Sequence, residues 1–220
     1  MSHWAVGLVI FHTLFYAVFI PRAAARLLAA ARAQASAAGS AGGAENGAPG
    51  LTERDHEQQA GERPRGVRTA RFAGSLVAFH MLALAVLYNG LMPALSGSPT
   101  LIEPRHVAGA ALMAAASALA AWALVVFRSW RIWASLTPDH QLVTGGPYRW
   151  VRHPIYLAMD LLAVGSWLWA PGAVAAVGAA LVMVAGDLRG RAEESLLQEE
   201  LGVPYRDYMR RVRRFVPGIY

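Results

Sequence analysis

The chain has 220 residues, of which 55% are hydrophobic and only 15% are charged, and its formal net charge is +6. An average soluble domain carries about 25% charged residues, so the long uncharged stretches indicate a membrane protein. The basic excess consists of arginine alone, near hydrophobic runs, which is typical of cytoplasmic loops and not of a nucleic-acid-binding surface. The chain has no cysteine, which excludes disulfides, thiolate metal sites and cysteine nucleophiles.

Five hydrophobic runs predict membrane helices, at about 3–20, 72–95, 107–127, 155–169 and 173–186. The first run is expected to end at Pro21, because proline interrupts a helix. The last two are short, and the turn Ala170-Pro171-Gly172 between them predicts a tight antiparallel hairpin. The sequence therefore predicts an all-α, polytopic membrane helical bundle with about five transmembrane helices.

The segment 22–70 is expected to be a flexible linker, because its middle is rich in Ala, Gly and Ser and shows no apolar period. A dinucleotide-binding loop around Gly39–Gly43 is not favoured, since no strand pattern precedes these glycines and no helix pattern follows them. Residues 1–127 are thus predicted to hold the N-terminal membrane helices and this linker. Residues 128–220 form a second unit that carries most of the polar residues.

The placement of arginine predicts the orientation of the bundle. Arginines gather in the first loop, in 128–152 and in the tail after Asp187, whereas the loop between the second and third runs holds only Arg105. By the positive-inside rule the N-terminus lies outside, and the linker and the C-terminus lie in the cytosol. The alanine- and arginine-rich composition suggests a bacterial inner membrane.

After Asp187 the pattern changes to a charged, amphipathic helix. Apolar residues recur there at helical spacing: Leu196, Leu197, Leu201, Tyr205, Tyr208 and Val212. Gly202 and Pro204 are expected to break this helix into two pieces. A helix of this kind lies on the cytosolic surface of a membrane.

Two blocks of polar residues stand out in the C-terminal third. The first runs from His140 to Tyr156, where Gly145-Gly146-Pro147 predicts a turn and Pro154 the start of a helix. The second is Arg189-Gly-Arg-Ala-Glu193-Glu194, in which Arg189 and Glu193 share one helix face and Glu194 points about 100° away. These blocks form either an ordinary membrane-interface loop with a surface ion pair or a ligand site at the mouth of a membrane cavity.

Four polar residues lie within the hydrophobic runs. Asp160 is placed one helical turn after Tyr156, and it either faces a cavity or bonds a neighbouring helix. His12, His80 and Asn89 are expected to form hydrogen bonds between helices.

The spacing of these motifs resembles the isoprenylcysteine carboxyl methyltransferase family. The resemblance covers about 130–217, and it is carried by His140, Leu142-Val143-Thr144, Gly146-Pro147-Tyr148, Arg152-His153-Pro154-x-Tyr156 and Arg189…Glu193-Glu194, followed by Gly202, Tyr205, Tyr208, Arg214 and Pro217. The family implies a methyltransferase core over 128–220 that uses S-adenosyl-L-methionine and accepts a lipophilic substrate from the bilayer.

The resemblance also implies roles for individual residues. Cofactor contacts fall on His140, Gln141, Leu142, Val143, Tyr148, His153, Pro154, Ile155, Tyr156 and Glu193. Arg189 is implied to bind the substrate carboxylate and to be the catalytic residue. One position departs from the family, since Trp133 stands where eukaryotic members have a cofactor-contacting glutamine.

These residue types suit the implied chemistry. Glu193 suits the ammonium group or the ribose of the cofactor, and tyrosine rings suit the adenine or the sulfonium. A carboxylate acceptor is already ionised at pH 7 and requires no general base, whereas a thiol or amine would require a proton acceptor such as His153 or Glu194. The implied partners are the bilayer and a lipophilic or small-molecule acceptor. The alternatives are methylation of a small thiol or lipid, an NADPH-dependent membrane reductase of the sterol-reductase type, a metal-dependent hydrolase and a structural protein.

Overall fold

The computed structural model describes residues 3–41, 68–69, 72–96, 102–127, 135–136 and 142–220. The described residues form helices α1 (His3–Ala17), α2 (Ile20–Ala41), α4 (Ala73–Ser96), α5 (Pro104–Val126), α6 (Pro154–Trp169), α7 (Ala173–Leu201) and α8 (Val203–Arg211), and the 3-10 helix η1 (Gly146–Arg149). A two-residue strand, β1 (Arg68–Thr69), pairs antiparallel with β2 (Ser135–Leu136). The fold is therefore helical, as predicted.

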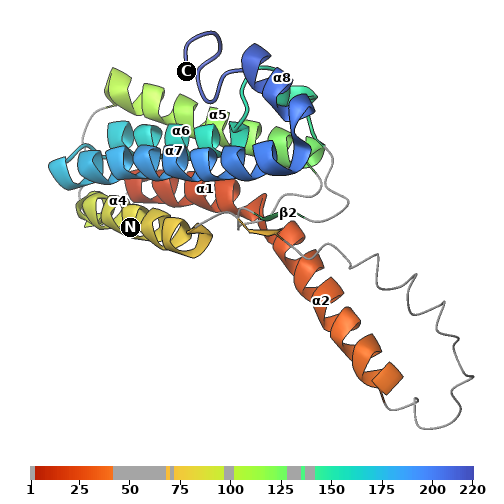
Figure 1. Ribbon diagram of the computed structural model, residues 1–220. Coiled ribbons are helices and arrows are strands. Elements are labelled where there is room, and N and C mark those ends of the chain that lie inside the picture. Colours follow the sequence, from red (N-terminus) through yellow and green to blue (C-terminus); the bar gives the residue numbers. More distant parts are fainter. Residues whose placement is uncertain (1–2, 42–67, 70–71, 97–101, 128–134, 137–141) are drawn as a thin grey trace, which may run out of the picture.

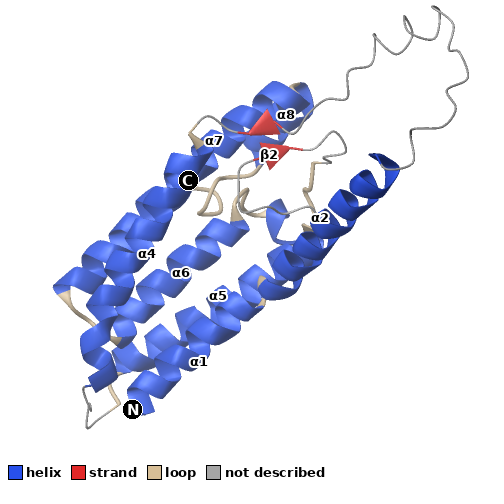
Figure 2. Ribbon diagram, turned by 90° about the horizontal axis from the view of Figure 1, so that it is seen from below, coloured by secondary structure: helices blue, strands red, loops and turns tan. Residues whose placement is uncertain are grey.

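Helices α1, α4, α5, α6 and α7 lie side by side in one bundle, and α2 extends away from it (Figure 1). The most extensive packing is of α5 on α6 and of α4 on α7. Figure 2 shows the same helices running along a common direction, with α2 following on from the end of α1. The core between them is formed by apolar side chains such as Phe15, Leu87, Met113, Leu162 and Val182.

The apolar helices have the dimensions of a membrane protein. Three are long and apolar enough to cross a bilayer, namely Ala73–Ala94, Pro104–Val126 and Ala173–Leu201. Two shorter apolar helices, Ala5–Ala17 and Pro154–Trp169, complete the bundle. Large hydrophobic side chains such as Leu82, Val125 and Val177 are exposed on its outer surface. An apolar surface of this kind fits a lipid environment and supports an integral membrane protein.

Glycines bring two pairs of helices into backbone contact at the end of the bundle where α4 ends and α7 begins. A Cβ on Gly90 would overlap the backbone of Ala175, and one on Gly178 would overlap the backbone of Leu87. Between α5 and α6, a Cβ on Gly109 would lie 2.7 Å from the carbonyl oxygen of Gly165. Small residues allow this close approach, which is a common way to pack helices in membranes.

The boundary after the first helix differs from the prediction. Helix α1 ends at Ala17, and Pro21 lies in the first turn of a new helix, α2, instead of closing the first one. The predicted linker over 22–70 is therefore helical as far as Ala41. The reason is composition: this stretch is rich in Ala, Leu and Arg, which are strong helix formers even without an apolar stripe. Residues 42–67 lie outside the described residues.

Helix α7 continues without a break from the apolar stretch 173–186 into the charged stretch 187–201. It ends at Gly202, which has a φ of 60° and so adopts a conformation that glycine accepts readily. Helix α8 starts immediately afterwards, with Pro204 in its first turn. The predicted hairpin of α6 and α7 and the predicted break near Gly202 are both confirmed.

The polar residues of the spans behave differently from one another. The Nδ1 atom of His12 lies 2.6 Å from the hydroxyl of Tyr88, and its Nε2 lies 2.8 Å from the hydroxyl of Ser166, so the expected interhelical bonds are present. Asn89 instead has an exposed side chain on α4. His80 is completely buried, yet neither ring nitrogen has a hydrogen-bond partner among the described residues.

Candidate active site

The first polar block forms a short 3-10 helix followed directly by α6. Gly146 opens η1 with a φ of 59°, and a Cβ there would lie 2.7 Å from Val126 on α5. Glycine is therefore required both by the backbone conformation and by the space. Pro154 is the first residue of α6, and His153 precedes it as the N-cap.

The segment after α8 returns alongside this block and brings a further arginine to it. The amide of Arg152 donates to the carbonyl of Arg213 at 2.8 Å, and the amide of His153 donates to the carbonyl of Arg214 at 3.2 Å. These two backbone bonds hold Arg214 beside Arg152 and His153, although Arg214 is distant from both in sequence.

Glu194 lies at the centre of this arrangement and is almost completely buried. Arg152 Nε donates to its Oε1 at 2.9 Å. Arg214 forms a two-point contact, with Nε 3.0 Å from Oε1 and Nη2 2.6 Å from Oε2. The Nε2 atom of His153 lies 3.1 Å from Oε1. A buried carboxylate with this many charged partners is well compensated and fixes the relative position of α6, α7 and the C-terminal segment.

Arg214 also contacts a second acidic residue at the edge of the cluster. Its Nη1 lies 2.8 Å from Oδ1 of Asp187, and Oδ2 of Asp187 accepts a hydrogen bond from Arg191 at 2.6 Å. The hydroxyl of Tyr220 donates to Asp187 at 2.8 Å. These more exposed contacts attach the end of the chain to α7.

Glu193 faces a different set of side chains from Glu194. The hydroxyl of Tyr156 donates a hydrogen bond to its Oε1, and His153 Nδ1 lies 3.5 Å from its Oε2. About a quarter of the Glu193 side chain is exposed, compared with 4% for Glu194. The two adjacent glutamates therefore divide into one that is enclosed by cations and one that remains partly accessible.

Arg189 lies over the ring of Tyr156, with its Cζ atom 4.9 Å from the ring centroid. Its side chain is buried, with 5% of the residue exposed. Tyr156 thus contacts Arg189 through its ring and Glu193 through its hydroxyl. The expectation that Arg189 and Glu193 lie on one face of the helix agrees with this shared contact.

His153 is held between the two carboxylates and stacks on Tyr156 with a centroid separation of 5.6 Å. Burial lowers the pKa of His153, but the hydrogen bonds and charges of Glu193 and Glu194 outweigh burial, and the pKa of His153 is raised above its usual value. Since both ring nitrogens already face carboxylates, His153 orients Glu193 more readily than it binds a ligand itself.

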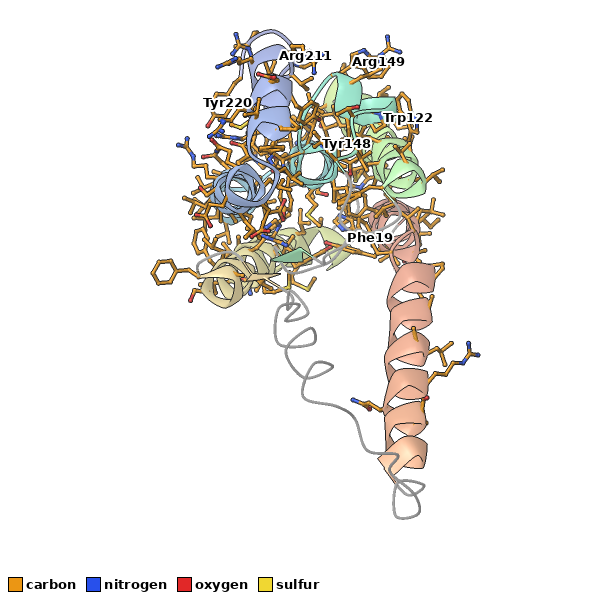
Figure 3. All side chains as sticks on the ribbon, turned by 45° about the vertical axis from the view of Figure 1, so that its right-hand side comes forward. Phe19, Trp122, Tyr148, Arg149, Arg211 and Tyr220 are labelled. Atoms are coloured by element: carbon orange, nitrogen blue, oxygen red, sulfur yellow. The ribbon has the colours of Figure 1, made fainter. Side chains whose placement is uncertain are left out.

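The other predicted cofactor residues surround this centre to different degrees. Tyr148, Pro154 and Ile155 are buried, and Tyr148 packs edge-on against Phe127. Leu142 packs against the tyrosines of α8, and Val143 against the cluster that contains Tyr148. His140, Gln141 and Trp133 lie outside the described residues. Figure 3 shows Tyr148 between the helices, with Trp122 and Arg149 toward the edge of the bundle.

Asp160 is also buried, one helical turn beyond Tyr156. Its Oδ1 has no hydrogen-bond partner among the described residues. A Cβ on Gly186 would lie 3.4 Å from this oxygen, so Asp160 packs against α7. No hydrogen bond of this oxygen to a neighbouring helix is found in the described part of the chain.

Sequence reasoning did not identify the partners of Glu194. From the sequence, Arg152 and Arg214 stand out only as parts of the family motifs, and helical geometry predicts only that Glu194 points about 100° away from Glu193. This angle predicts that the two carboxylates face different surroundings, but not which segments they face. The three cations around Glu194 come from distant segments, and local spacing does not predict them.

The chemical character of the centre fits an amphiphilic, charged ligand. A partly accessible carboxylate, held by a hydroxyl and a histidine, can accept hydrogen bonds from an ammonium group or a diol. A buried guanidinium one turn closer to the apolar part of α7 can bind an anionic oxygen at two points.

Comparison with known families agrees with the motifs. The sequence model of the isoprenylcysteine carboxyl methyltransferase (ICMT) family matches residues 107–199, from α5 to the charged stretch of α7. No curated protein matches the chain. The matched residues include η1, Tyr156, Arg189 and Glu193, so this part of the chain is similar to the isoprenylcysteine carboxyl methyltransferase family.

Proposed function

We propose that the protein is an S-adenosyl-L-methionine-dependent membrane methyltransferase that methylates a carboxylate oxygen of an isoprenylcysteine-like or other lipophilic acceptor. The observation that carries this proposal is the contact of Tyr156 with both Arg189 and Glu193. It gives one aromatic side chain a cation on one side and a carboxylate on the other. A methyl donor with an ammonium group and an acceptor with a carboxylate require such a pair of opposite charges close together.

Glu193 is proposed to bind the cofactor, together with Tyr148, Tyr156 and the backbone of Leu142–Val143. The residues fit the group: Glu193 is a partly exposed carboxylate that is already oriented by Tyr156 and His153. The buried tyrosines add aromatic surface for a sulfonium or an adenine. When bound, S-adenosyl-L-methionine supplies a methyl group on sulfur, so that an O–CH3 bond forms while the S–CH3 bond breaks and its electron pair stays on sulfur, leaving S-adenosylhomocysteine.

Arg189 is proposed to hold the acceptor carboxylate and to be the catalytic residue. A guanidinium can bind both carboxylate oxygens and direct one of them. The carboxylate is ionised at neutral pH, so no residue has to remove a proton. The burial of Arg189 keeps water from the reacting oxygen, which increases its reactivity. Positioning and exclusion of water are therefore the contributions of the protein.

The proposal includes a topology in which five helices cross the membrane. Two pairs of bundle helices run antiparallel: Gly90 near the end of α4 packs on Ala175 near the start of α7, and Gly109 near the start of α5 packs on Gly165 in α6. Together with the arginine distribution, this supports an N-terminus outside and the polar centre in the cytosol. Residues 128–220 would then form the methyltransferase core, with α8 on the cytosolic surface of a bacterial inner membrane.

The test is binding of S-adenosylhomocysteine to the purified protein in detergent. Ligand at 100 times its dissociation constant should stabilise the fold by about 2.7 kcal/mol, measured as a shift in thermal unfolding. NADPH is the matched control, because a reductase would respond to it instead. A folded sample that responds to NADPH and not to S-adenosylhomocysteine would overturn the proposal. Methyl transfer to small thiols and to lipids, measured with labelled cofactor, separates the remaining acceptor classes.

A further inference from the structure

Two buried polar side chains near Arg189 have no role in the site described above. His80 on α4 has no exposed surface, and both of its ring nitrogens are without a hydrogen-bond partner among the described residues. Asp160 on α6 is 9% exposed, and its Oδ1 also has no hydrogen-bond partner among the described residues. Unsatisfied polar groups are costly in the apolar part of a membrane protein. Their retention therefore points to a ligand.

Both residues face the stretch of α7 that leads to Arg189. Leu87 packs on Gly178 where the antiparallel helices α4 and α7 meet, so His80, two turns earlier on α4, lies beside the stretch 185–189 of α7. The charge of Arg189 acts on the ring of His80. From the other side, Asp160 packs against Gly186, one turn from Arg189.

A comparison with His12 shows that burial alone does not leave a histidine unpaired in this fold. His12 is also buried within the bundle, but its two ring nitrogens contact Tyr88 at 2.6 Å and Ser166 at 2.8 Å. The fold therefore provides partners for a histidine that links helices. For His80, no described residue forms a hydrogen bond with either ring nitrogen.

We propose that His80 and Asp160 complete the acceptor end of the site and recognise an N–H or O–H donor next to the carboxylate that Arg189 holds. Arg189 donates hydrogen bonds only, neutral His80 offers one donor and one acceptor, and the free oxygen of Asp160 accepts. The set is complementary to a head group that combines an anionic oxygen with a neighbouring donor, as in an N-acylated amino acid. The proposal rests on the proposed function of Arg189. Asp160 lies within the residues matched by the family model and His80 lies outside them.

The first measurement requires no acceptor. His80→Leu and Asp160→Leu remove an unsatisfied polar group from apolar surroundings, so each should raise the thermal unfolding temperature of the free protein by roughly 2–4 °C. His12→Leu is the matched control, and it should lower the unfolding temperature because Tyr88 and Ser166 lose their partner. His80→Phe, which fills the space of the ring, serves if the leucine variant does not fold.

The second measurement compares two acceptors with the same lipid tail, N-acetyl-S-farnesylcysteine and S-farnesyl-3-thiopropionic acid, of which only the first has an N–H next to the carboxylate. The wild-type protein should methylate the first with a kcat/KM at least about tenfold higher. In the His80 and Asp160 variants this ratio should fall to about threefold or less, while the affinity for S-adenosylhomocysteine stays within about threefold of wild type.

The outcomes separate the two proposals. A fall in unfolding temperature equal to that of His12→Leu, or an unchanged ratio in the variants, would show that His80 and Asp160 are structural. Binding of S-adenosylhomocysteine without methylation of either acid overturns the proposed head group and leaves the cofactor assignment intact. If S-adenosylhomocysteine does not bind, the proposed function fails, and the unfolding temperatures still decide whether His80 and Asp160 are retained for a ligand.

Discussion

The hydroxyl of Tyr156 on α6 donates a hydrogen bond to Glu193 on α7. The same side chain carries the guanidinium of Arg189 over its ring, at 4.9 Å from the centroid. The orientations of Glu193 and Arg189 are thus coupled through one tyrosine. In the proposed reaction, these two residues hold the two substrates.

Replacement of Tyr156 by phenylalanine separates the two contacts, because the ring remains and the hydroxyl is lost. A hydrogen bond to a charged group contributes about 1.5–3 kcal/mol, so the affinity for S-adenosylhomocysteine should fall by roughly ten- to a hundredfold. Tyr88→Phe is the control, since Tyr88 bonds His12 in the middle of the bundle. Isothermal titration of both variants measures the difference. Equal affinity in Tyr156→Phe and wild type would contradict the role of the hydroxyl.

The adjacent glutamates should respond differently to substitution by glutamine. Glu193→Gln should weaken S-adenosylhomocysteine binding by about 1.5–3 kcal/mol with little effect on the fold. Glu194→Gln leaves Arg152, His153 and Arg214 around a neutral group, which should lower the free energy of unfolding by about 3–5 kcal/mol. Asp207→Asn, in a surface pair with Arg210, is the control for stability. If Glu193→Gln and Glu194→Gln changed ligand affinity and the free energy of unfolding equally, the proposed difference between a ligand-binding and a structural glutamate would be refuted.

Arg189→Lys tests whether the guanidinium holds the acceptor. Lysine keeps the charge and loses the two-point geometry, so turnover should fall at least about tenfold while the affinity for S-adenosylhomocysteine stays within about threefold. The two values come from a methyl-transfer assay and from titration of the same preparation. A collapse of cofactor affinity would instead place Arg189 in the cofactor site and remove the support for a carboxylate acceptor.

His153 should make the stability of the protein depend on pH. Its pKa in the folded protein is raised by Glu193 and Glu194, with Arg152, Arg214 and Tyr156 also nearby. The stabilisation from protonated His153 is therefore fully present below the unfolded pKa of about 6.5 and is lost as the pH rises through the higher folded value. The thermal unfolding temperature of the wild-type protein should fall as the pH rises through that window. The fall should be smaller in His153→Gln. An identical pH profile for the two proteins would exclude the linkage.

Much of the fold follows from sequence periodicity. The apolar runs, the hairpin at Ala170–Gly172 and the break at Gly202 depend on local composition, and they were predicted within a few residues. The separation of α1 from α2 was not predicted, because Pro21 is compatible both with the end of one helix and with the first turn of the next. The partners of His12 also follow a general rule for polar residues in membranes, whereas the exposure of Asn89 depends on the rotation of α4.

The candidate site was predictable in residue type and less so in contacts. Helical geometry places Arg189 and Glu193 on one face and turns Glu194 away from them. The ring of cations around Glu194 requires the C-terminal segment to return beside His153, and this return depends on two backbone hydrogen bonds between residues far apart in sequence. Such pairing has no local signal, so the strongest electrostatic cluster of the centre was the least visible in the sequence.

The glycine contacts of the bundle restrict the route by which a lipid tail can reach Arg189. At Gly90 and Gly178 the backbones of α4 and α7 are in contact, and at Gly109 and Gly165 those of α5 and α6 are in contact. A hydrocarbon chain cannot pass between the helices at these points. These helix contacts lie in the half of the bundle opposite to the polar centre. In the proposed orientation, with the polar centre in the cytosol, a portal that admits lipid from the bilayer between either pair would therefore open in the cytosolic leaflet. The protein would then draw its acceptor from that leaflet alone, and a substrate inserted on the other side would first have to flip.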